Sequence, residues 1–216
     1  ALQLNYFNGR GLAETSRLIL AIVQQEYTDF RYPLKVVDWK TYSFVRDEFD
    51  RDKADGKLTQ SLNKVPFLNV GEHVISQSKA IERYLARRYN LVGDTVVQAA
   101  QIDALCEWIR DFKTDYQKIR QTSDEMREVA MNTWFTETLP TKLGDLEVTV
   151  GNGFSVGDRL SLADITIYSF ITQFFDNSVG SLAATANTPN IRSVVDQVGN
   201  LTTVKEWLAK RPETPF

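Results

Sequence analysis

The sequence predicts two domains, a small α/β domain followed by an all-α helical domain. Apolar residues follow mixed strand and helix spacing before residue 90, and they follow helical spacing almost throughout after residue 95. The stretch between them, NLVGDT, interrupts both patterns with a glycine and polar turn residues. We therefore expect an α/β domain over 1–89, a linker over 90–95 and a helical domain over 96–216, in a chain of 216 residues that is long enough for both.

The first three elements of the α/β domain follow from the spacing of apolar residues. Leu2, Leu4 and Tyr6 alternate with other residues and predict a short strand. Apolar residues at helical spacing over 13–25 predict a helix, and the alternation over 30–34 predicts a second strand. The chain is therefore expected to begin as a β-α-β unit.

The rest of this domain is predicted to hold two more strands and a helix. The stretch 39–63 is charged and irregular, and we expect it to be a surface excursion. Apolar residues on both sides of Gly71 predict a β-hairpin over 67–75. Ser76 or Ser78 can then cap a helix that runs to the linker, so the predicted order is β-α-β, excursion, β-β-α.

The second domain is predicted to be helical throughout. Pro140 lies inside one helical stretch and predicts a kink or break there. Ser161 and Asp164 have the spacing of a capping box at the start of a strongly apolar helix, and two short helices are expected over 194–198 and 204–208. The first helix of the domain carries an apolar stripe with steps of three and four residues: Ile102, Leu105, Ile109, Phe112, Tyr116 and Ile119.

The composition excludes several kinds of partner. The 25 Lys and Arg residues against 28 Asp and Glu residues give a net charge of -3, so no basic field attracts the chain to nucleic acid. The longest apolar run, 18–23, is far shorter than the ~20 residues of a membrane-spanning helix. We expect a cytoplasmic protein without nucleic-acid or membrane partners.

The counts of cysteine and histidine limit metal and redox chemistry. Cys106 is the single cysteine, which excludes an internal disulfide, a CxxC redox pair and a thiolate zinc cluster. His73 is the single histidine, which excludes a multi-histidine metal site and argues against a Ser/His hydrolase. We therefore expect no bound metal.

Pro66 lies at the start of an apolar run, LNKVPFLNV, that otherwise has the composition of a strand. Proline has no backbone N–H, so a strand that begins with it leaves a neighbouring backbone group unpaired. One interpretation is that Pro66 only protects the edge of the sheet. The other is that the unpaired backbone binds a ligand, as an added strand would.

Five sequence motifs, in this order along essentially the whole chain, resemble the cytosolic glutathione transferases: LNYFNGRGLAE, NKVPFL, ISQSKAIERYLARRYNLVG, VGDRLSLADI and EWLAKRPETPF. The first and last of these motifs are most similar to the sigma class. The resemblance implies a thioredoxin-like N-terminal domain that binds glutathione and an all-α C-terminal domain that contributes the electrophile site. It further implies a homodimer that conjugates glutathione to small hydrophobic electrophiles for detoxification, with glutathione as co-substrate and no other cofactor.

The resemblance also implies roles for particular residues. Tyr6 matches the catalytic tyrosine, which donates its hydroxyl to the glutathione thiolate; without the resemblance it would be a core aromatic. Val65 precedes a proline, Pro66, that is cis in this family, and its backbone meets the cysteinyl part of glutathione. Gln77 and Ser78 match contacts to the γ-glutamyl carboxylate at a helix N-terminus, although Ser78 would also serve as a plain cap.

The remaining site residues are implied in the same way. The electrophile pocket is expected to include Phe112, Tyr116, Phe170 and Phe216. Asp111 corresponds to a residue that reaches the glutathione of the partner subunit, or it is an ordinary solvated carboxylate. Further glutathione contacts are expected from Phe7, Arg10, Trp39, Lys40, Asn63 and Lys64.

Two departures from the family pattern bear on activity. At the position of Leu12, many sigma-class sequences carry a basic residue that supports the catalytic tyrosine. Either Arg10 substitutes for that basic residue here, or Arg10 is an ordinary turn residue. Prostaglandin synthases carry a tryptophan where this chain has Lys118, which argues against prostaglandin isomerisation. A non-catalytic ligandin or crystallin-like protein that retains glutathione binding is the alternative function.

Overall fold

The computed structural model describes residues 1–38 and 43–214. Their contacts divide the chain into two compact units. Unit 1 comprises Ala1–Leu85 together with the C-terminal segment Trp207–Phe216, and unit 2 comprises Ala86–Glu206. The C-terminal segment thus belongs to unit 1, whereas the sequence groups it with the helical domain.

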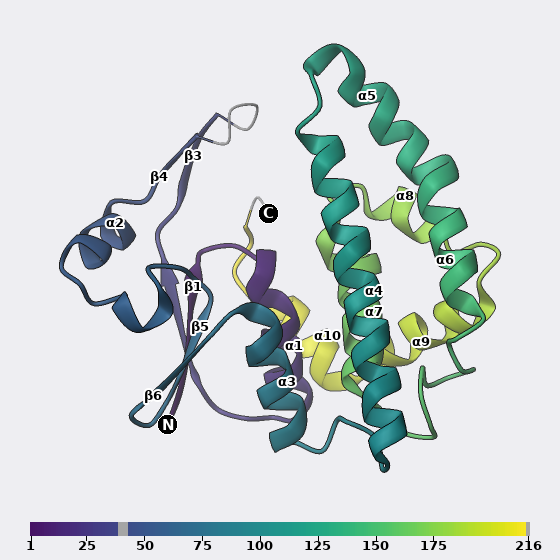
Figure 1. Cartoon of the computed structure of the whole chain (residues 1–216), viewed down its shortest axis with the longest axis horizontal. Helices are drawn as coiled ribbons and strands as arrows, with labels where there is room; N and C mark the ends of the chain where they lie inside the picture. The colour runs from purple at the N-terminus through teal and green to yellow at the C-terminus, as the bar shows by residue number, and fades with distance from the viewer. Residues whose placement is uncertain (39–42, 215–216) are drawn as a thin grey trace. The chain divides into compact units, whose positions relative to one another are not determined.

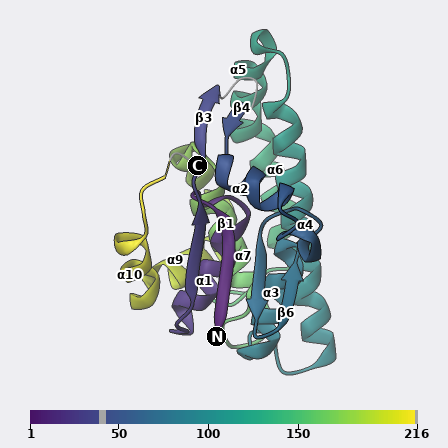
Figure 2. The same cartoon turned by 90° about the vertical axis from the view of Figure 1, so that its left-hand side faces the viewer.

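Unit 1 is an α/β structure built on a four-stranded sheet. Strand β1 pairs in parallel with β2 and antiparallel with β5, and β5 pairs antiparallel with β6, which gives the order β2-β1-β5-β6. Figures 1 and 2 show α1 and α3 on one face of this sheet and α2 on the other. Its elements are β1 (Leu2–Phe7), η1 (Gly11–Ala13), α1 (Glu14–Ile22), β2 (Thr28–Tyr32), β3 (Lys35–Asp38), β4 (Ser43–Val45), α2 (Asp47–Ala54), η2 (Thr59–Ser61), β5 (Phe67–Val70), β6 (His73–Ser76) and α3 (Ser78–Arg88).

The apolar face of the sheet forms the interior of unit 1. Leu4 on β1 and Leu68 on β5 are fully buried, as are Leu18 on α1 and Ile81 and Leu85 on α3. The alternation predicted for the first strand is therefore confirmed, and Ile81 and Leu85 form the inward face of α3. This packing fixes the sheet beneath the two helices and holds the ends of its strands in place.

The expectation that the stretch 39–63 is irregular is wrong for most of its described residues, which form β4, α2 and η2. The strand β4 pairs with β3, which precedes the stretch, in a two-stranded ribbon. Phe49 anchors α2, because its side chain is 3% exposed and its ring lies 5.5 Å from that of Tyr32. One buried aromatic residue therefore holds a helix whose other side chains are mostly charged.

Unit 2 is all helical. The predicted stripe on α4 is confirmed, since Ile102, Leu105, Ile109, Phe112 and Tyr116 are buried. Its helices are α4 (Val96–Arg120), α5 (Asp124–Thr133), α6 (Leu139–Glu147), α7 (Leu162–Ser169), α8 (Ser178–Ala183) and α9 (Pro189–Asn200), with wider helical turns η3 (Trp134–Thr138) and η4 (Phe170–Phe174). The last helix, α10 (Thr202–Lys210), begins in unit 2 and ends in the C-terminal segment of unit 1.

Two local predictions in unit 2 are also confirmed. Pro140 lies in the first turn of α6, where a helix tolerates a residue without an N–H, and the wider turn η3 separates it from α5. Ser161 and Asp164 form the capping box of α7: the backbone N–H and the hydroxyl of Ser161 both donate to the Asp164 carboxylate. Within the described part of the chain, no helix is both long and apolar enough to cross a membrane.

Candidate functional site

The sheet register brings three of the predicted segments to one edge of unit 1. Asn5 of β1 is paired with Phe67 of β5, and Phe67 is in turn paired with Ser76 of β6. Because both pairings are antiparallel, the end of β1, the residues before β5 and the residues after β6 lie at the same end of the sheet. Tyr6, the Val65 and Pro66 peptide, and the start of α3 are therefore neighbours by topology.

Tyr6 lies near the end of β1 with its side chain 8% exposed. The backbone N–H of Leu12 donates a hydrogen bond of 3.2 Å to the Tyr6 hydroxyl oxygen. Burial raises the pKa of Tyr6 above its ordinary value, and the Leu12 N–H and the Arg17 guanidinium oppose that rise. The hydroxyl is thus protonated at neutral pH, and it keeps its own proton to donate to a further acceptor.

Gly11 allows the turn after β1 to pack against Tyr6. Its φ of +38° is a backbone conformation that residues with a side chain rarely adopt. A Cβ atom at this position would lie 2.5 Å from the Tyr6 hydroxyl oxygen and 3.0 Å from the ring. Glycine is therefore required here by both the backbone and the close approach of the phenol.

A buried charge network underlies the same turn. Arg17 is fully buried; its Nη1 donates to the Gly9 carbonyl at 2.5 Å and its Nε donates to Asp29 at 3.1 Å. Its guanidinium lies 5.9 Å from the centre of the Tyr6 ring and 3.6 Å from Glu14. Arg17 thus fixes the turn that carries Leu12, a role that sequence reasoning missed.

The segment before β5 has the backbone features expected of a ligand-facing loop. The Val65–Pro66 peptide bond is cis, as the resemblance implies. Val65 is half-buried and precedes Phe67, the first paired residue of β5, so it lies outside the sheet ladder. Asn63 has a positive φ of 58°, and Lys64 is exposed.

The residues at the start of α3 present backbone N–H groups at the same edge. Gln77 is exposed and has a φ of 74°, and Ser78 is the first residue of the helix. The first N–H groups of a helix have no partner within the helix, and the helix dipole is positive at this end. This arrangement can bind a carboxylate group.

The other predicted contacts of unit 1 are only partly brought together. Phe7 is half-buried, and its ring centre lies 5.7 Å from that of Tyr6. Arg10 belongs to the turn, where its Nε is buried and has no hydrogen-bond partner within the described residues. The predictions for Trp39, Lys40 and Phe216 fall outside the described residues.

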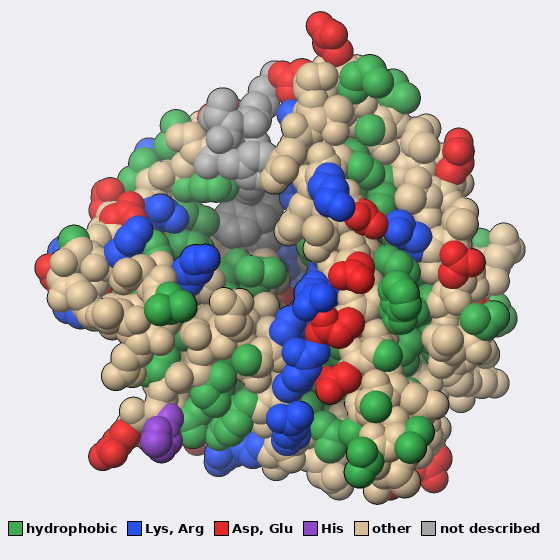
Figure 3. Space-filling view, viewed as in Figure 1, with side chains coloured by type: hydrophobic (Ala, Val, Ile, Leu, Met, Phe, Trp, Pro, Cys, Tyr) green, Lys and Arg blue, Asp and Glu red, His purple; other side chains and the backbone are tan. Residues whose placement is uncertain are grey.

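Asp111 lies on α4 in unit 2 and is open to solvent. Its side chain is 56% exposed, and the nearest cation is the Arg110 guanidinium at 3.7 Å. Figure 3 shows basic and acidic side chains close together on the surface over α4. The contact of Asp111 with the partner's glutathione stays a prediction.

The aromatic residues predicted for the electrophile pocket lie in the interior of unit 2. Phe112, Tyr116 and Phe170 are 7%, 1% and 0% exposed. The ring centres of Phe112 and Phe170 are 6.3 Å apart, and Tyr116 lies 4.8 Å from Phe175. These contacts account for core packing, and the role of the three residues in a pocket stays a prediction.

Comparison with known proteins gives consistent matches over the chain. Residues 2–87 match the family model for the glutathione S-transferase N-terminal domain, and residues 110–211 match that for the C-terminal domain. The chain is 31% identical to glutathione S-transferase S1 of Drosophila melanogaster, over 98% of this chain and 79% of the relative. It is also 31% identical to hematopoietic prostaglandin D synthase of Gallus gallus, over 98% of this chain and 97% of the relative. Its fold is similar to that of a monomeric glutathione S-transferase of the hookworm Necator americanus, with a TM-score of 0.81, 24% identity and coverage of 100% and 99% of the two chains.

Proposed function

Because the chain belongs to the glutathione S-transferase family, we propose that it conjugates the glutathione thiolate to small hydrophobic electrophiles. Enzymes of this family use glutathione as co-substrate and need no other cofactor. The observation that carries the proposal is the environment of Tyr6, whose hydroxyl oxygen accepts from the Leu12 N–H and whose raised pKa leaves it with a proton that it can donate. The proposed location is the cytosol, as for the cytosolic branch of the family.

The chemical task is to hold a thiol as a thiolate. A thiol with a pKa of about 8.5 must be shifted by about 2 units to ionise mostly at neutral pH, which corresponds to roughly 2.7 kcal/mol. One hydrogen bond to a charged group contributes about 1.5–3 kcal/mol. The Tyr6 hydroxyl can provide most of that free energy, and the Leu12 N–H polarises the hydroxyl as a donor.

The edge of the sheet supports the binding of the peptide part of glutathione. We assign the cysteinyl backbone to Val65, beside the cis Pro66, where it pairs like an added strand. The γ-glutamyl carboxylate is assigned to Gln77 and Ser78, because the N-terminus of α3 favours an anion. Other proposed glutathione contacts are Phe7, Arg10, Trp39, Lys40, Asn63 and Lys64.

We propose a sigma-like enzyme that acts by conjugation and not by prostaglandin isomerisation. The motifs at both ends of the chain support the class, as does the similarity to the Drosophila enzyme. Lys118 is 70% exposed and pairs with Asp115 at 3.0 Å, where prostaglandin synthases have a tryptophan. The proposed electrophile pocket includes Phe112, Tyr116, Phe170 and Phe216.

We further propose that the protein acts as a homodimer. The support is the place of Asp111, which is exposed on α4 at the position where the sigma class contacts the partner's glutathione. An exposed carboxylate such as that of Asp111, here 3.7 Å from the Arg110 guanidinium, can also bind an ammonium group of a ligand.

The proposed linker lies over 90–95, between the proposed glutathione-binding domain and the proposed helical domain.

The test is retention on immobilised glutathione followed by a conjugation assay with an activated chloronitroarene. We expect the parent protein to be retained and to conjugate, and Tyr6→Phe to be retained but to lose roughly 10-fold to 150-fold in turnover. Tyr27→Phe is the matched control, because its hydroxyl is buried without a partner within the described residues. Retention of the parent without turnover would favour a ligandin and contradict the enzyme proposal.

A further inference from the structure

Glu14 is the first residue of α1, and its carboxylate is closed off from solvent. The residue is 2% exposed, and its Oε2 atom is buried without a hydrogen-bond partner within the described residues. A buried carboxylate is unfavourable unless cations or hydrogen-bond donors surround it. The groups that balance Glu14 therefore decide where its carboxylate lies.

Those groups come from both ends of the chain. In the C-terminal segment, the Trp207 indole N–H donates to Glu14 Oε1 at 2.9 Å, and Arg211 Nη1 donates to the same oxygen at 2.5 Å. On α1, Arg17 Nη1 lies 3.6 Å from Glu14 Oε2. All four residues belong to unit 1. The Glu14 carboxylate thus lies between two guanidinium groups, one near each end of the chain.

Arg17 Nη1 has two acceptors nearby and bonds to one of them. It donates to the Gly9 carbonyl at 2.5 Å, whereas Glu14 Oε2, at 3.6 Å, is beyond hydrogen-bond distance. Because Trp207 and Arg211 bind the other oxygen of Glu14, they hold its carboxylate away from Arg17. The arginine is therefore left to bind the Gly9 carbonyl.

The Gly9 carbonyl belongs to the turn that presents the Leu12 N–H to Tyr6. Leu12 follows Gly9 by three positions, so a displacement of Gly9 also moves Leu12. The hydrogen bond from the Leu12 N–H to the Tyr6 hydroxyl is 3.2 Å, which is the long end of the normal range for such a bond. A small displacement of the turn would therefore break it.

We propose that Glu14 and the C-terminal segment position the Tyr6 hydroxyl for the thiol of glutathione. Trp207 and Arg211 hold Glu14, which leaves Arg17 to fix the turn. Glu14, Trp207 and Arg211 are thus positioning residues, which act through the turn and not through a contact with the thiol. This inference rests on the proposed conjugation of glutathione, and it adds these three residues to those on which the rate depends.

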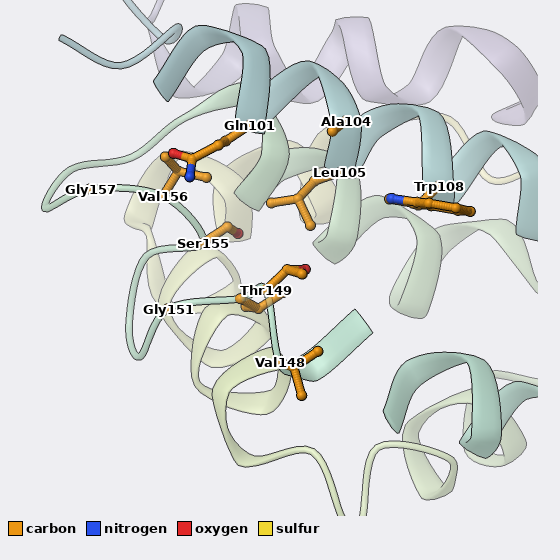
Figure 4. Close-up of a pocket in the computed structure, with 11 residues that line it drawn as sticks. Gln101, Ala104, Leu105, Trp108, Val148, Thr149, Gly151, Ser155, Val156 and Gly157 are labelled. Atoms are coloured by element: carbon orange, nitrogen blue, oxygen red, sulfur yellow. The ribbon is translucent and has the colours of Figure 1, made fainter. Parts of the chain in front are cut away.

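The network of Glu14, Arg17, Trp207 and Arg211 shares no residue with the hollow of unit 2 that Figure 4 shows. That hollow is lined by residues of α4, of the segment after α6 and of the loop before α7. Substitutions in the network therefore leave its lining unchanged.

The test is a titration of the thiol of bound glutathione by ultraviolet difference absorbance, together with a pH–rate profile, in the parent protein and in Arg211→Met. Methionine keeps an unbranched side chain and removes the cation. We expect the pKa of the bound thiol to rise by about 1 unit. Turnover below the pKa values of both proteins should then fall about 10-fold, because each unit changes the thiolate fraction tenfold. At high pH turnover should approach that of the parent, and glutathione affinity should change less than about 3-fold.

Three further variants separate the network from a general effect of charge. Trp207→Phe removes the indole N–H and keeps an aromatic ring, and it should shift the thiol pKa in the same direction as Arg211→Met. Arg211→Lys keeps a cation and should retain most of the parent's behaviour. Lys210→Met is the matched control, because it removes a charge of the same sign from an exposed position in the same segment, and it should match the parent.

A thermal melt of each variant distinguishes positioning from a purely structural role. An unchanged thiol pKa in both Arg211→Met and Trp207→Phe would overturn the inference, whatever the melting temperatures. An equal loss of turnover at every pH would also overturn it. A parent protein that binds glutathione and does not conjugate it would contradict the proposed function alone, since the titration of the bound thiol would still decide the inference.

Discussion

Leu12 supports Tyr6 through its backbone N–H, which donates to the hydroxyl oxygen at 3.2 Å. Its side chain is 48% exposed and apolar, so it does not replace the basic residue that many sigma-class sequences have there. The buried Arg17 guanidinium supplies a positive charge instead, 5.9 Å from the centre of the Tyr6 ring. We expect Tyr6 to remain an effective donor despite the loss of that basic side chain.

Gly11→Ala should displace the Tyr6 hydroxyl, because the new Cβ would lie 2.5 Å from the hydroxyl oxygen. We expect turnover to fall at least about 10-fold near neutral pH, which is about 1.4 kcal/mol, while glutathione affinity changes little. The control is Gly71→Ala, which has a φ of +58° but no atom within 4 Å of its Cβ. Steady-state kinetics measures the turnover, and calorimetry measures the glutathione affinity. An equal loss of turnover in both variants would contradict a specific effect of the Gly11 substitution on Tyr6.

Ser78→Ala should weaken glutathione binding, because it removes a charge-assisted contact at the N-terminus of α3. A bond of about 1.5–3 kcal/mol corresponds to roughly 10-fold to 150-fold in affinity. Calorimetry measures the affinity, and a thermal melt measures the loss of helix capping. A lower melting temperature with unchanged affinity would show that Ser78 acts only as a cap.

The sequence points to some residues of the proposed site and not to others, for a physical reason. The resemblance implies roles for Tyr6, Pro66 and Ser78, and each lies at a recognisable local pattern: near a strand end, just before a strand and at a helix start. Arg17 has no such pattern, because its partners are the Gly9 carbonyl and Asp29 on another strand. Only the folded chain brings those groups to a buried arginine.

At the level of elements, helices with a long apolar stripe are predictable and short elements are not. The stripe on α4 has six apolar residues between Ile102 and Ile119, over about five turns, and gives a strong periodic signal. The strand β4 has three residues, and α2 has one buried side chain, Phe49. Their positions depend on contacts with the rest of unit 1, such as that between Phe49 and Tyr32.

Asp164 connects the start of α7 with the loop before it, through four hydrogen bonds donated by Ser155 and Ser161. Asp164→Ala would leave these donors without their partner and should lower the free energy of unfolding by at least about 2 kcal/mol. Asp158→Ala, an exposed position in the same loop, is the control. Urea denaturation measures both, and equal stability of the two variants would contradict the role of Asp164.

For the whole molecule, the predicted fold class is confirmed: a thioredoxin-like α/β domain and an all-α domain, as in the glutathione S-transferase family. The assignment of the C-terminal segment to unit 1 was not predictable from periodicity. Glu14, 2% exposed, accepts from the Trp207 indole at 2.9 Å and pairs with Arg211 at 2.5 Å. These contacts join residues almost two hundred positions apart in the sequence.

The proposed assembly makes a prediction about Asp111. We expect light scattering to show a dimer. We expect Asp111→Ala to weaken glutathione binding and to leave the dimer intact, because the carboxylate would reach the ligand of the partner subunit. Asp103→Ala, on the same helix, is the control. A monomer that binds glutathione normally would contradict the dimer, and a dimer with unchanged affinity in Asp111→Ala would contradict the contact across subunits.

The most direct test of the central claim is an ultraviolet difference titration of the thiol of bound glutathione, in the parent protein and in Tyr6→Phe. Because burial keeps the pKa of Tyr6 above its ordinary value near 10, the hydroxyl remains a donor across the whole range in which the thiol titrates. We predict that the pKa of the bound thiol is about 1–2 units higher in Tyr6→Phe, and that the two proteins approach the same turnover at high pH. Coincident titration curves would contradict the claim that Tyr6 stabilises the thiolate.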